Sequence, residues 1–409
     1  MANEVKLSDK EIETFVKKRD GVVAASITDG PDKKVRNFLV IGCGDGGCNI
    51  ASLIKTQIPM TKVIAYNTSE RAMNNLTTDI NIIPLKTDEE AGKDEKTEDG
   101  SGKDRGLSQS IFKRGSYRQV ANKAIEYINA DNTIEYILIT TTTGGGTGGG
   151  ISPMLAKFMA DNLPIPVIVL GVYPSLSEDA TAMYNAMAWQ SEVEKYNIPY
   201  IILDNNKSDS NPVTIHRIVN ELAADTIKLL SGVLYGNTNI TAVDNQDMYT
   251  LLTMPGRISA IGSADKLPVG KSLDDYLIEH FTQSQMVAPV NLKGVALFVK
   301  GPEDLISRVD TSLTKFSAQY GVPAIQYVHL EESKDTYIAV VCSGCGEASD
   351  RLAMCKQRYD EVMDGVAETQ SSVDTLLQDM SSPIGGSNRA GKKPRISLNT
   401  ELDLSALNL

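Results

Sequence analysis

Thr140-Thr141-Thr142-Thr143-Gly144-Gly145-Gly146-Thr147-Gly148-Gly149-Gly150 is the stretch that decides the fold of this 409-residue chain. Six of the seven residues after Thr143 are glycine, and each ordered glycine costs roughly 0.5–1 kcal/mol of chain entropy. A loop that wraps a polyphosphate with consecutive N–H groups needs many glycines, because a Cβ would block the approach. A flexible linker is the alternative, but an apolar strand precedes the run and Ser152-Pro153 is expected to open a helix after it. The loop Gly144–Gly150 therefore predicts a phosphate-binding turn.

Short apolar, β-branched runs alternate with helical stretches through the first half of the chain. The runs are Phe38–Ile41, Val63–Tyr66, Ile80–Leu85, Tyr136–Thr140, Val167–Val172 and Tyr200–Leu203. Nearly continuous apolar strands between helices predict a parallel sheet that is covered on both faces. Ligands of such sheets bind at the carboxyl ends of the strands, which is where the glycine run falls.

A second α/β block follows a long helix that the apolar spacing predicts over residues 213–231. The strands predicted in this block are Arg257–Gly262, Gly294–Lys300, Ala324–Val328 and Tyr337–Cys342. From Ala348 to Met380 the apolar residues recur at steps of three and four, which predicts a helix packed on one surface. We expect that surface to belong to its own second domain, with a neighbouring molecule as the alternative.

A second glycine motif, Gly42-Cys43-Gly44-Asp45-Gly46-Gly47, fits the pattern G-x-G-x-x-G between a strand and a helix. Its backbone can approach a phosphate closely, and a helix N-terminus attracts anions. An NAD-dependent oxidoreductase is the rival interpretation. That class wants an acidic residue after the second strand, where this chain has Asn67-Thr68.

Composition and charge exclude several classes. A net charge of −12 argues against direct nucleic-acid binding, which needs a basic face. No stretch approaches the roughly 20 apolar residues of a membrane span, and the first residues lack a signal-peptide core. Five scattered cysteines fit a reduced, cytoplasmic protein. Cys342 and Cys345 form C-x-x-C without a second pair, so strand packing is favoured over a zinc or redox site, and no metal-ligating residue is predicted.

The two glycine motifs together resemble those of the tubulin/FtsZ superfamily of filament-forming GTPases, and the resemblance extends from about Arg36 to Gly346. It implies an α/β fold with a parallel-sheet GTP-binding domain, a long central helix and a second, smaller α/β domain. It also implies GTP or GDP as the bound nucleotide, with Mg²⁺ held through the phosphates. The residues that the resemblance places around the nucleotide are Asp45, Gly46, Gly47, Cys48, Asn49, Asn67, Gly144, Gly145, Gly146, Thr147, Gly148, Gly149, Glu178, Asp179, Asn205, Asn220 and Glu221.

The resemblance also assigns roles within this set. Glu178 and Asp179 correspond to acceptors of the ribose hydroxyls, and Asn205 lies near the base and ribose. Asn220 and Glu221 match the pair that reads guanine. Guanine presents N1–H and N2–H₂ donors side by side, and an amide or carboxylate oxygen accepts from both.

The segment Ala242-Val243-Asp244-Asn245-Gln246-Asp247 resembles the catalytic loop of the superfamily, which carries two acids three residues apart. In isolation, acids at a helix start are more often capping residues that offset the helix dipole. The resemblance implies instead that Asp244 and Asp247 catalyse GTP hydrolysis in the next molecule of a head-to-tail filament. The main expected partner of the chain is therefore itself.

Departures from the common pattern favour a divergent branch. Gly149, Ala182 and Ala242 stand where division proteins of the superfamily usually carry other residues. The chain looks closer to TubZ or to phage tubulins, which implies cytoskeletal filaments that position plasmid, phage or other DNA. A cell-division ring protein of the FtsZ type is the alternative. A second alternative is a member of the superfamily that binds GTP without hydrolysing it.

The expected organisation combines these parts. The predicted boundaries are 1–35 for an N-terminal helical extension, 36–204 for the GTP-binding domain, 205–235 for the central helix, 236–347 for the second (activation) domain, 348–380 for the C-terminal helix and 381–409 for a flexible tail. The charged stretch Thr87–Gly106 predicts a mobile loop. A basic cluster in the tail suggests that an adaptor protein binds there, with solvated disorder as the alternative.

Overall fold

The computed structural model describes residues 36–74, 76, 80–84, 100–206, 211–232, 234 and 240–380, with only the backbone at 70, 84, 116 and 366–380. The predicted N-terminal extension, the tail and most of the charged stretch from residue 87 lie outside these ranges. Within them, no helix is long and apolar enough to cross a membrane.

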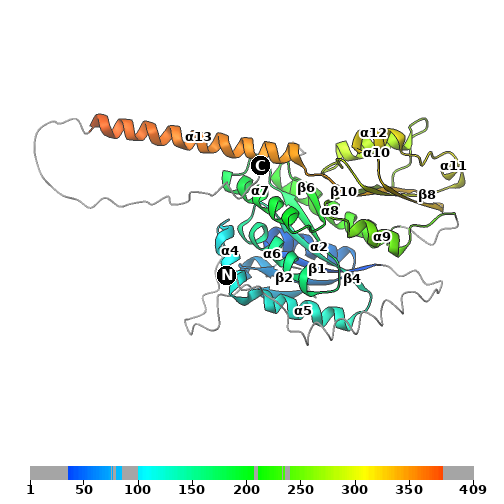
Figure 1. Ribbon diagram of the computed structural model, residues 1–409, viewed down its shortest axis with the longest axis horizontal. Helices are drawn as coiled ribbons and strands as arrows, with labels where there is room; N and C mark the ends of the chain where they lie inside the picture. Colours follow the sequence, from blue (N-terminus) through cyan, green and yellow to red (C-terminus); the bar gives the residue numbers. More distant parts are fainter. Residues whose placement is uncertain are drawn as a thin grey trace, which may run out of the picture.

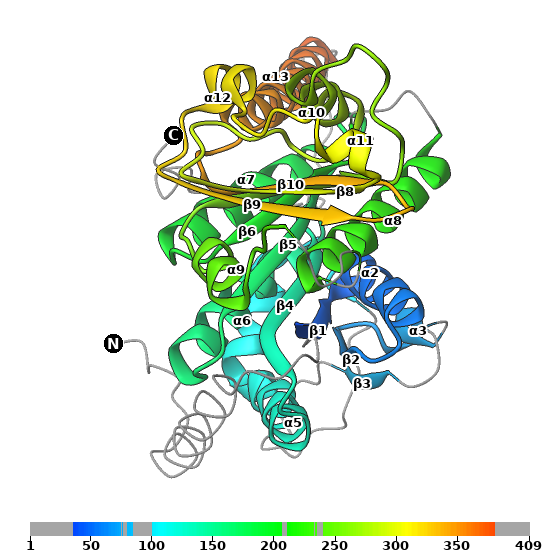
Figure 2. The same cartoon turned by 90° about the vertical axis from the view of Figure 1, so that its right-hand side faces the viewer.

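One sheet of ten strands runs through the described part of the chain (Figures 1 and 2), in the order β3-β2-β1-β4-β5-β6-β7-β10-β8-β9. The strands are β1 Asn37–Cys43, β2 Lys62–Asn67, β3 Asn81–Pro84, β4 Ile134–Thr142, β5 Val167–Tyr173, β6 Tyr200–Asp204, β7 Arg257–Ser263, β8 Gly294–Gly301, β9 Ile325–Glu332 and β10 Tyr337–Cys345. Every neighbouring pair from β3 to β7 is parallel, whereas β10 pairs antiparallel with both β7 and β8. All ten predicted strands are confirmed, with ends shifted by at most a few residues.

The helices follow the strands in the order expected of an α/β fold. They are α2 Gly44–Gln57, α3 Glu70–Met73, α4 Arg105–Ile111, the π-helical turn η2 Phe112–Ser116, α5 Tyr117–Ala130, α6 Gly146–Asn162, α7 Ala180–Lys195, α8 Pro212–Ser231, α9 Asn245–Leu252, α10 Leu273–Gln283, α11 Glu303–Ile306, α12 Thr314–Tyr320 and α13 Ser349–Met380. The predicted long helix is α8, which starts at a proline and ends at left-handed Gly232.

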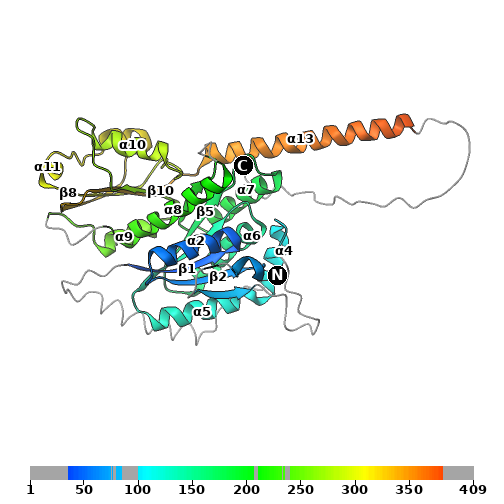
Figure 3. The same ribbon diagram turned by 180° about the vertical axis from the view of Figure 1, so that it is seen from behind.

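Two cores cover the two faces of the sheet because successive side chains of a strand point to opposite sides. In β1, Phe38 and Val40 belong to the core under α2 and α8, whereas Leu39 and Ile41 belong to the core under α5, α6 and α7. Figure 3 shows α2 and α8 together on one side of β1 and β2, with α5 on the other. The strands are buried on both faces, as their continuous apolar sequence predicts.

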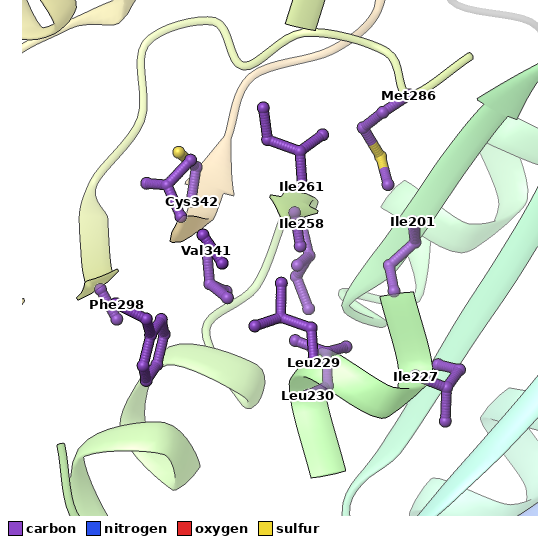
Figure 4. Close-up of a cluster of buried hydrophobic side chains, with 14 of the residues drawn as sticks. Ile201, Ile227, Leu229, Leu230, Ile258, Ile261, Met286, Phe298, Val341 and Cys342 are labelled. Carbon is purple, nitrogen blue, oxygen red and sulfur yellow. The ribbon is translucent and has the colours of Figure 1, made fainter. Parts of the chain in front are cut away.

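The two halves of the sheet meet at β6 and β7, which share only the aligned pairs Tyr200–Arg257 and Ile201–Ile258. The core under α8 continues across this join, from Ile201 and Ile227 to Val341 and Phe298 (Figure 4). Arg257 is fully buried at the join, and its guanidinium donates to the Ser259 hydroxyl and to the carbonyls of Val287, Ala288 and Gly346. A buried guanidinium is tolerated only when its donors find partners. These acceptors tie β7 to the end of β10 and to Val287, whose N–H in turn donates to the Ile202 carbonyl of β6 at 3.2 Å.

The first turns of α13 pack against α7, and Leu352, Cys355 and Tyr359 enter the core beneath that helix. Tyr359 lies 6.2 Å from Tyr184 of α7, measured between ring centroids. The expectation that α13 runs along the second domain is therefore wrong. The apolar stripe specifies one buried face but not its partner, and Figure 1 shows the remainder of α13 projecting past α7.

A carboxyl group at the end of α7 links stability to pH. Burial raises the pKa of Glu194 from 4.5 to about 7, and the nearby Glu347 carboxylate adds to this shift, while the Tyr200 hydroxyl donates to Glu194 and opposes it. The folded chain therefore binds this proton more tightly than the unfolded chain does. Its contribution to stability is complete below pH 4.5 and is lost as the pH rises through about 7.

We expect Glu194→Gln to be more stable than the wild type at pH 8, by about 1–2 kcal/mol after a discount for partial exposure. The difference should shrink towards pH 5, because the wild-type carboxyl group is then neutral as well. Urea denaturation of both proteins from pH 5 to 8 measures it. Glu303→Gln, at an exposed position, is the control and should show no such trend. A difference independent of pH would contradict this role of Glu194.

Candidate nucleotide site

The glycine run forms the junction between β4 and α6. Its loop is shorter than expected, because most of the run belongs to the helix. Helix α6 already begins at Gly146, with Gly145 as its N-cap, so Pro153 lies inside the helix rather than at its start. Because proline has no N–H, the Gly149 carbonyl lacks its usual helical donor, and Arg105 donates to it at 3.4 Å. The expectation that Ser152 and Pro153 open the helix is therefore wrong by about two turns.

Most glycines of the run are required by close packing within the chain. A Cβ at Gly148 would lie 2.3 Å from the Thr141 hydroxyl oxygen, and one at Gly149 would lie 2.2 Å from the Thr143 carbonyl oxygen. At Gly146 it would meet Ser101 at 2.4 Å. Only Gly145 among these glycines faces ordinary contacts, the nearest at 3.6 Å. Gly145 is therefore the position of the run at which a ligand has room to approach the backbone.

The first glycine motif builds a second helix start beside this one. Helix α2 begins at Gly44, whose φ of +73° favours glycine, and a Cβ there would lie 2.8 Å from the Gly148 nitrogen. A Cβ at Gly47 would lie 2.1 Å from the Thr140 carbonyl oxygen. The starts of α2 and α6 thus touch at the carboxyl ends of β1 and β4, and neither has a side-chain cap.

Five other helices of eight or more residues, or of seven in the case of α4, do have such caps, whereas the short α11 and α12 do not. The capping residues are Asp104 for α4, Asp179 for α7, Asn211 for α8, Asp244 for α9 and Ser272 for α10. A helix start without a cap leaves N–H donors and a partial positive charge for an anion. Two such starts side by side fit the two or more phosphates of a nucleotide.

The predicted residues on α2 differ in their exposure. Asp45 and Asn49 are exposed, whereas Gly47 and Cys48 are buried. The Cys48 thiol donates to the Gly42 carbonyl at 3.3 Å, and burial raises its pKa to about 12. This side chain is committed to the strand end, so the Asp45 and Asn49 side chains and the glycine backbone remain for a ligand. Although the Asp45 side chain reaches solvent, the chain around it partly desolvates the carboxyl group and raises its pKa.

Hydroxyl groups gather at the start of α6. The Thr147 hydroxyl lies 2.7 Å from that of Thr68 and 3.2 Å from that of Ser101. Beside Thr68, the Asn67 side chain is buried, and its Nδ2 donor has no hydrogen-bond partner among the described residues. An unpartnered buried donor at this place fits a ligand oxygen.

Segment 100–105 crosses the glycine junction. The sequence did not predict this contact. Lys103 donates to Asp179 at 2.7 Å and lies 3.6 Å from Glu178. Asn185 of α7 donates to the carbonyls of both Lys103 and Gly144. The predicted mobile loop is therefore wrong for residues 100–106, which are folded against the candidate site. Their glycines and charges conceal this, because the signal lies in what they contact rather than in any apolar pattern.

The acids assigned to the ribose lie at the carboxyl end of β5. Glu178 accepts from the Ser175 N–H at 3.1 Å, and Asp179 caps α7 through the Ala182 N–H at 2.9 Å. Partial burial alone would raise the pKa of Asp179, but the Lys103 ammonium and the Ala182 N–H outweigh it and lower the pKa. Asp179 therefore carries negative charge near neutral pH. Asn205 follows β6, and its buried Oδ1 has no described partner.

The residues assigned to guanine lie midway along α8, which packs against α2. Asn220 is half-buried, and Glu221 pairs with Arg217 at 2.9 Å one turn earlier. The Glu221 carboxylate would have to share or leave this exposed ion pair to accept from a base.

Asp244 and Asp247 lie at the opposite end of the sheet. Helix α8 starts after the carboxyl end of β6 and its 20 residues span about 30 Å, and at its far end the Ser231 carbonyl accepts from Arg36, just before β1. The Arg36 guanidinium also donates to Asn245 at 2.9 Å. Figure 1 shows α9 well separated from α4, which packs on the start of α6. The structure does not bring these acids to the glycine junction of their own molecule.

At their own location the two acids form a reciprocal capping box. The Asp247 N–H donates to Asp244 Oδ1 at 2.8 Å, and the Asp244 N–H donates to Asp247 Oδ2 at 3.0 Å. Both carboxylates are fixed at the first turn of α9, at the protein surface. Capping is thus one role of the pair, and the exposed carboxylate surface leaves room for a second.

Comparisons with known proteins point to the family that the two glycine motifs resemble. Residues 37–210 match the model of the Tubulin/FtsZ family, GTPase domain. The tubulin-like protein CetZ2 of Haloferax volcanii is 26% identical over 231 residues, which are 55% of this chain and 62% of CetZ2, so the match spans less than two thirds of that relative.

Solved structures share the fold. TubZ of Clostridium botulinum phage c-st superposes on 81% of this chain and all of its own, with a TM-score of 0.62 and 19% identity. A GTPγS-form protofilament of Bacillus thuringiensis serovar israelensis TubZ covers 87% of this chain and 97% of its own, with a TM-score of 0.64 and 17% identity. Residues 37–210 thus match a GTPase domain of the Tubulin/FtsZ family, and the chain shares the fold of these solved structures.

Proposed function

We propose that the protein binds GTP at the paired starts of α2 and α6 and hydrolyses it within head-to-tail filaments. The observation that carries this proposal is the separation of the site into two parts. The glycine junction lies at the carboxyl ends of β1 and β4, whereas Asp244 and Asp247 lie beyond the far end of α8. A second molecule stacked along this axis would bring its acids to the nucleotide of the first.

The residues of the junction fit a guanine nucleotide. The uncapped N–H groups of α2 and α6 would hold the phosphates, Glu178 and Asp179 the ribose, and Asn205, Asn220 and Glu221 the base. Asn67 Nδ2 and Asn205 Oδ1, which have no partner in the part of the chain that the structure describes, are consistent with ligand contacts. Mg²⁺ held by the phosphates would offset their negative charge.

The chemistry requires a water molecule to attack the γ-phosphorus atom. Its oxygen forms the new P–O bond, the bond to the β–γ bridging oxygen breaks, and GDP and phosphate leave. Asp244 or Asp247 of the neighbouring molecule would orient that water and accept its proton. The N–H groups at the starts of α2 and α6 would stabilise the charge that develops on the phosphate oxygens.

A contact of this kind is heterologous, because one end of a molecule meets the other end of the next, and it produces an open filament. We infer, from the departures at Gly149, Ala182 and Ala242, that such filaments position DNA in the manner of TubZ or phage tubulins. Depletion of the protein in its host should then disturb plasmid or phage retention. A block in septum formation would favour a division role instead.

The turnover per molecule should rise steeply with protein concentration, since a lone molecule would lack the acids at its nucleotide. We expect at least a tenfold rise, on the order of the general-base contribution, between dilute and assembled protein. Phosphate release and light scattering, measured together across a concentration series, test this. Turnover that is constant per molecule would mean that the site is complete within one chain.

A further inference from the structure

Two arginines on α13 reach the loops of the candidate nucleotide site. Arg351 and Arg358 are seven residues apart, which places them two turns apart on one face of the helix. The buried Arg351 guanidinium donates to Asp204 at 2.9 Å, to the Pro174 carbonyl, and to the Cys355 sulfur at 3.1 Å. Arg358 donates to the Leu176 carbonyl at 3.1 Å.

These partners belong to the two segments that carry the predicted ribose and base contacts. Pro174 and Leu176 precede Glu178 and Asp179, and Asp204 directly precedes Asn205. The segments are also bonded to each other, because the Asn205 N–H donates to the Tyr173 carbonyl at 3.2 Å and the Leu176 N–H to Asn206 at 3.1 Å. Helix α13 therefore holds both segments from the side opposite α8.

The docking of α13 includes a buried ion pair between Arg351 and Asp204. Arg351 and Asp204 are both almost fully buried, at 6% and 4% exposure. Separation of such a pair leaves an uncompensated buried charge, which is strongly unfavourable. When α13 leaves α7, Asp204 and the Pro174 and Leu176 carbonyls lose these donors, and the two segments lose the contacts that fix them. The docking of α13 and the arrangement of the nucleotide loops are thus coupled.

We propose that α13 controls nucleotide affinity, with Arg351 and Arg358 as positioning residues that hold the 173–179 and 204–206 segments in their binding arrangement. The inference rests on the proposed GTP site. The projecting part of α13 is then a surface for regulation, because any partner that binds it and separates this helix from α7 weakens nucleotide binding. By linkage, bound nucleotide stabilises the docking of α13 by the same factor.

Binding of a fluorescent GDP analogue to the full chain, at a concentration at which sedimentation shows monomers, tests the proposal. Arg351→Met should raise the Kd about 10–100-fold, and Arg358→Ala about threefold. Lys356→Ala is the matched control and should leave the Kd unchanged, because among the described residues this exposed side chain pairs only with Asp360, along α13. If Arg351→Met fails to fold, Arg351→Met combined with Asp204→Asn removes both buried charges and should fold with the same raised Kd.

Hydrogen exchange provides the reciprocal measurement. Saturating GDP should slow amide exchange in residues 349–359 of the wild type, and this slowing should be lost in the folded double variant. A wild-type Kd in both the folded double variant and Arg358→Ala would overturn the coupling, as would exchange in α13 that GDP does not change. If the wild type itself bound no guanine nucleotide, the proposed site would fail first and the coupling with it.

Discussion

Asp247→Asn is expected to reduce GTP turnover about 10²–10⁴-fold while GTP-dependent filaments still form and last longer. The reason is that asparagine retains a side-chain oxygen but cannot accept a proton from water at neutral pH. Asp244→Asn should act in the same direction, and asparagine remains a good N-cap for α9. Phosphate release and electron microscopy of the same samples separate turnover from assembly.

The conservative substitution matters because both carboxylates also cap α9. Alanine at Asp244 would remove the acceptor of the Asp247 N–H and cost about 1 kcal/mol, which confuses a local folding defect with lost catalysis. Asp304→Asn, at an exposed position in the first turn of α11, is the control and should retain full turnover. Full hydrolysis by both the Asp244 and Asp247 variants would exclude these acids from the mechanism.

Gly149→Ala is expected to destabilise the fold by about 2–3 kcal/mol, because its Cβ would lie 2.2 Å from the Thr143 carbonyl oxygen, a backbone atom with little freedom to move. Nucleotide binding should fall as a consequence of the displaced α6 start. Urea denaturation measures the free energy of unfolding, and equilibrium binding of a fluorescent GDP analogue measures the affinity.

Gly145→Ala is its matched partner from the same run. Its Cβ would meet nothing closer than 3.6 Å, so stability should stay within about 0.5 kcal/mol of wild type. The nucleotide Kd should nevertheless rise at least tenfold, because the methyl group occupies the approach to the N–H groups of α6. An unchanged Kd would show that the phosphates approach elsewhere. A stable Gly149→Ala protein would show that the glycine run is looser than its geometry indicates.

The elements of the fold were predictable because each strand carries its own signal. Runs such as Val167–Val172 carry an apolar side chain at every position but Gly171, so their burial on both faces follows from the sequence alone. The partner of α13 was not predictable. Leu352, Cys355 and Tyr359 define an apolar face, but a face fits any apolar surface of suitable shape, and the choice of α7 depends on Arg351 finding Asp204.

The position of the candidate site was predictable from the sequence, but the reason why its glycines are required was not. The run Gly144–Gly150 marks the junction, but a sequence cannot distinguish a Cβ excluded by a ligand from one excluded by the chain itself. For Gly148 and Gly149 the chain itself is the reason. The contact of Lys103 was not predictable, because a charged side chain in a glycine-containing stretch is typical of solvated loops. Its ion pair with Asp179 joins two segments that are 76 residues apart in the sequence.

Arg257 gives the molecule a mechanical property. Shear between the halves of the sheet would break the two aligned pairs of β6 and β7 and the hydrogen bonds of segment 285–287 to β6, a segment that Arg257 ties to β7. The body therefore resists internal flexing. A filament of such molecules would bend at the interfaces between them. Substitutions at those interfaces, rather than inside the molecule, should therefore alter the curvature of the filament.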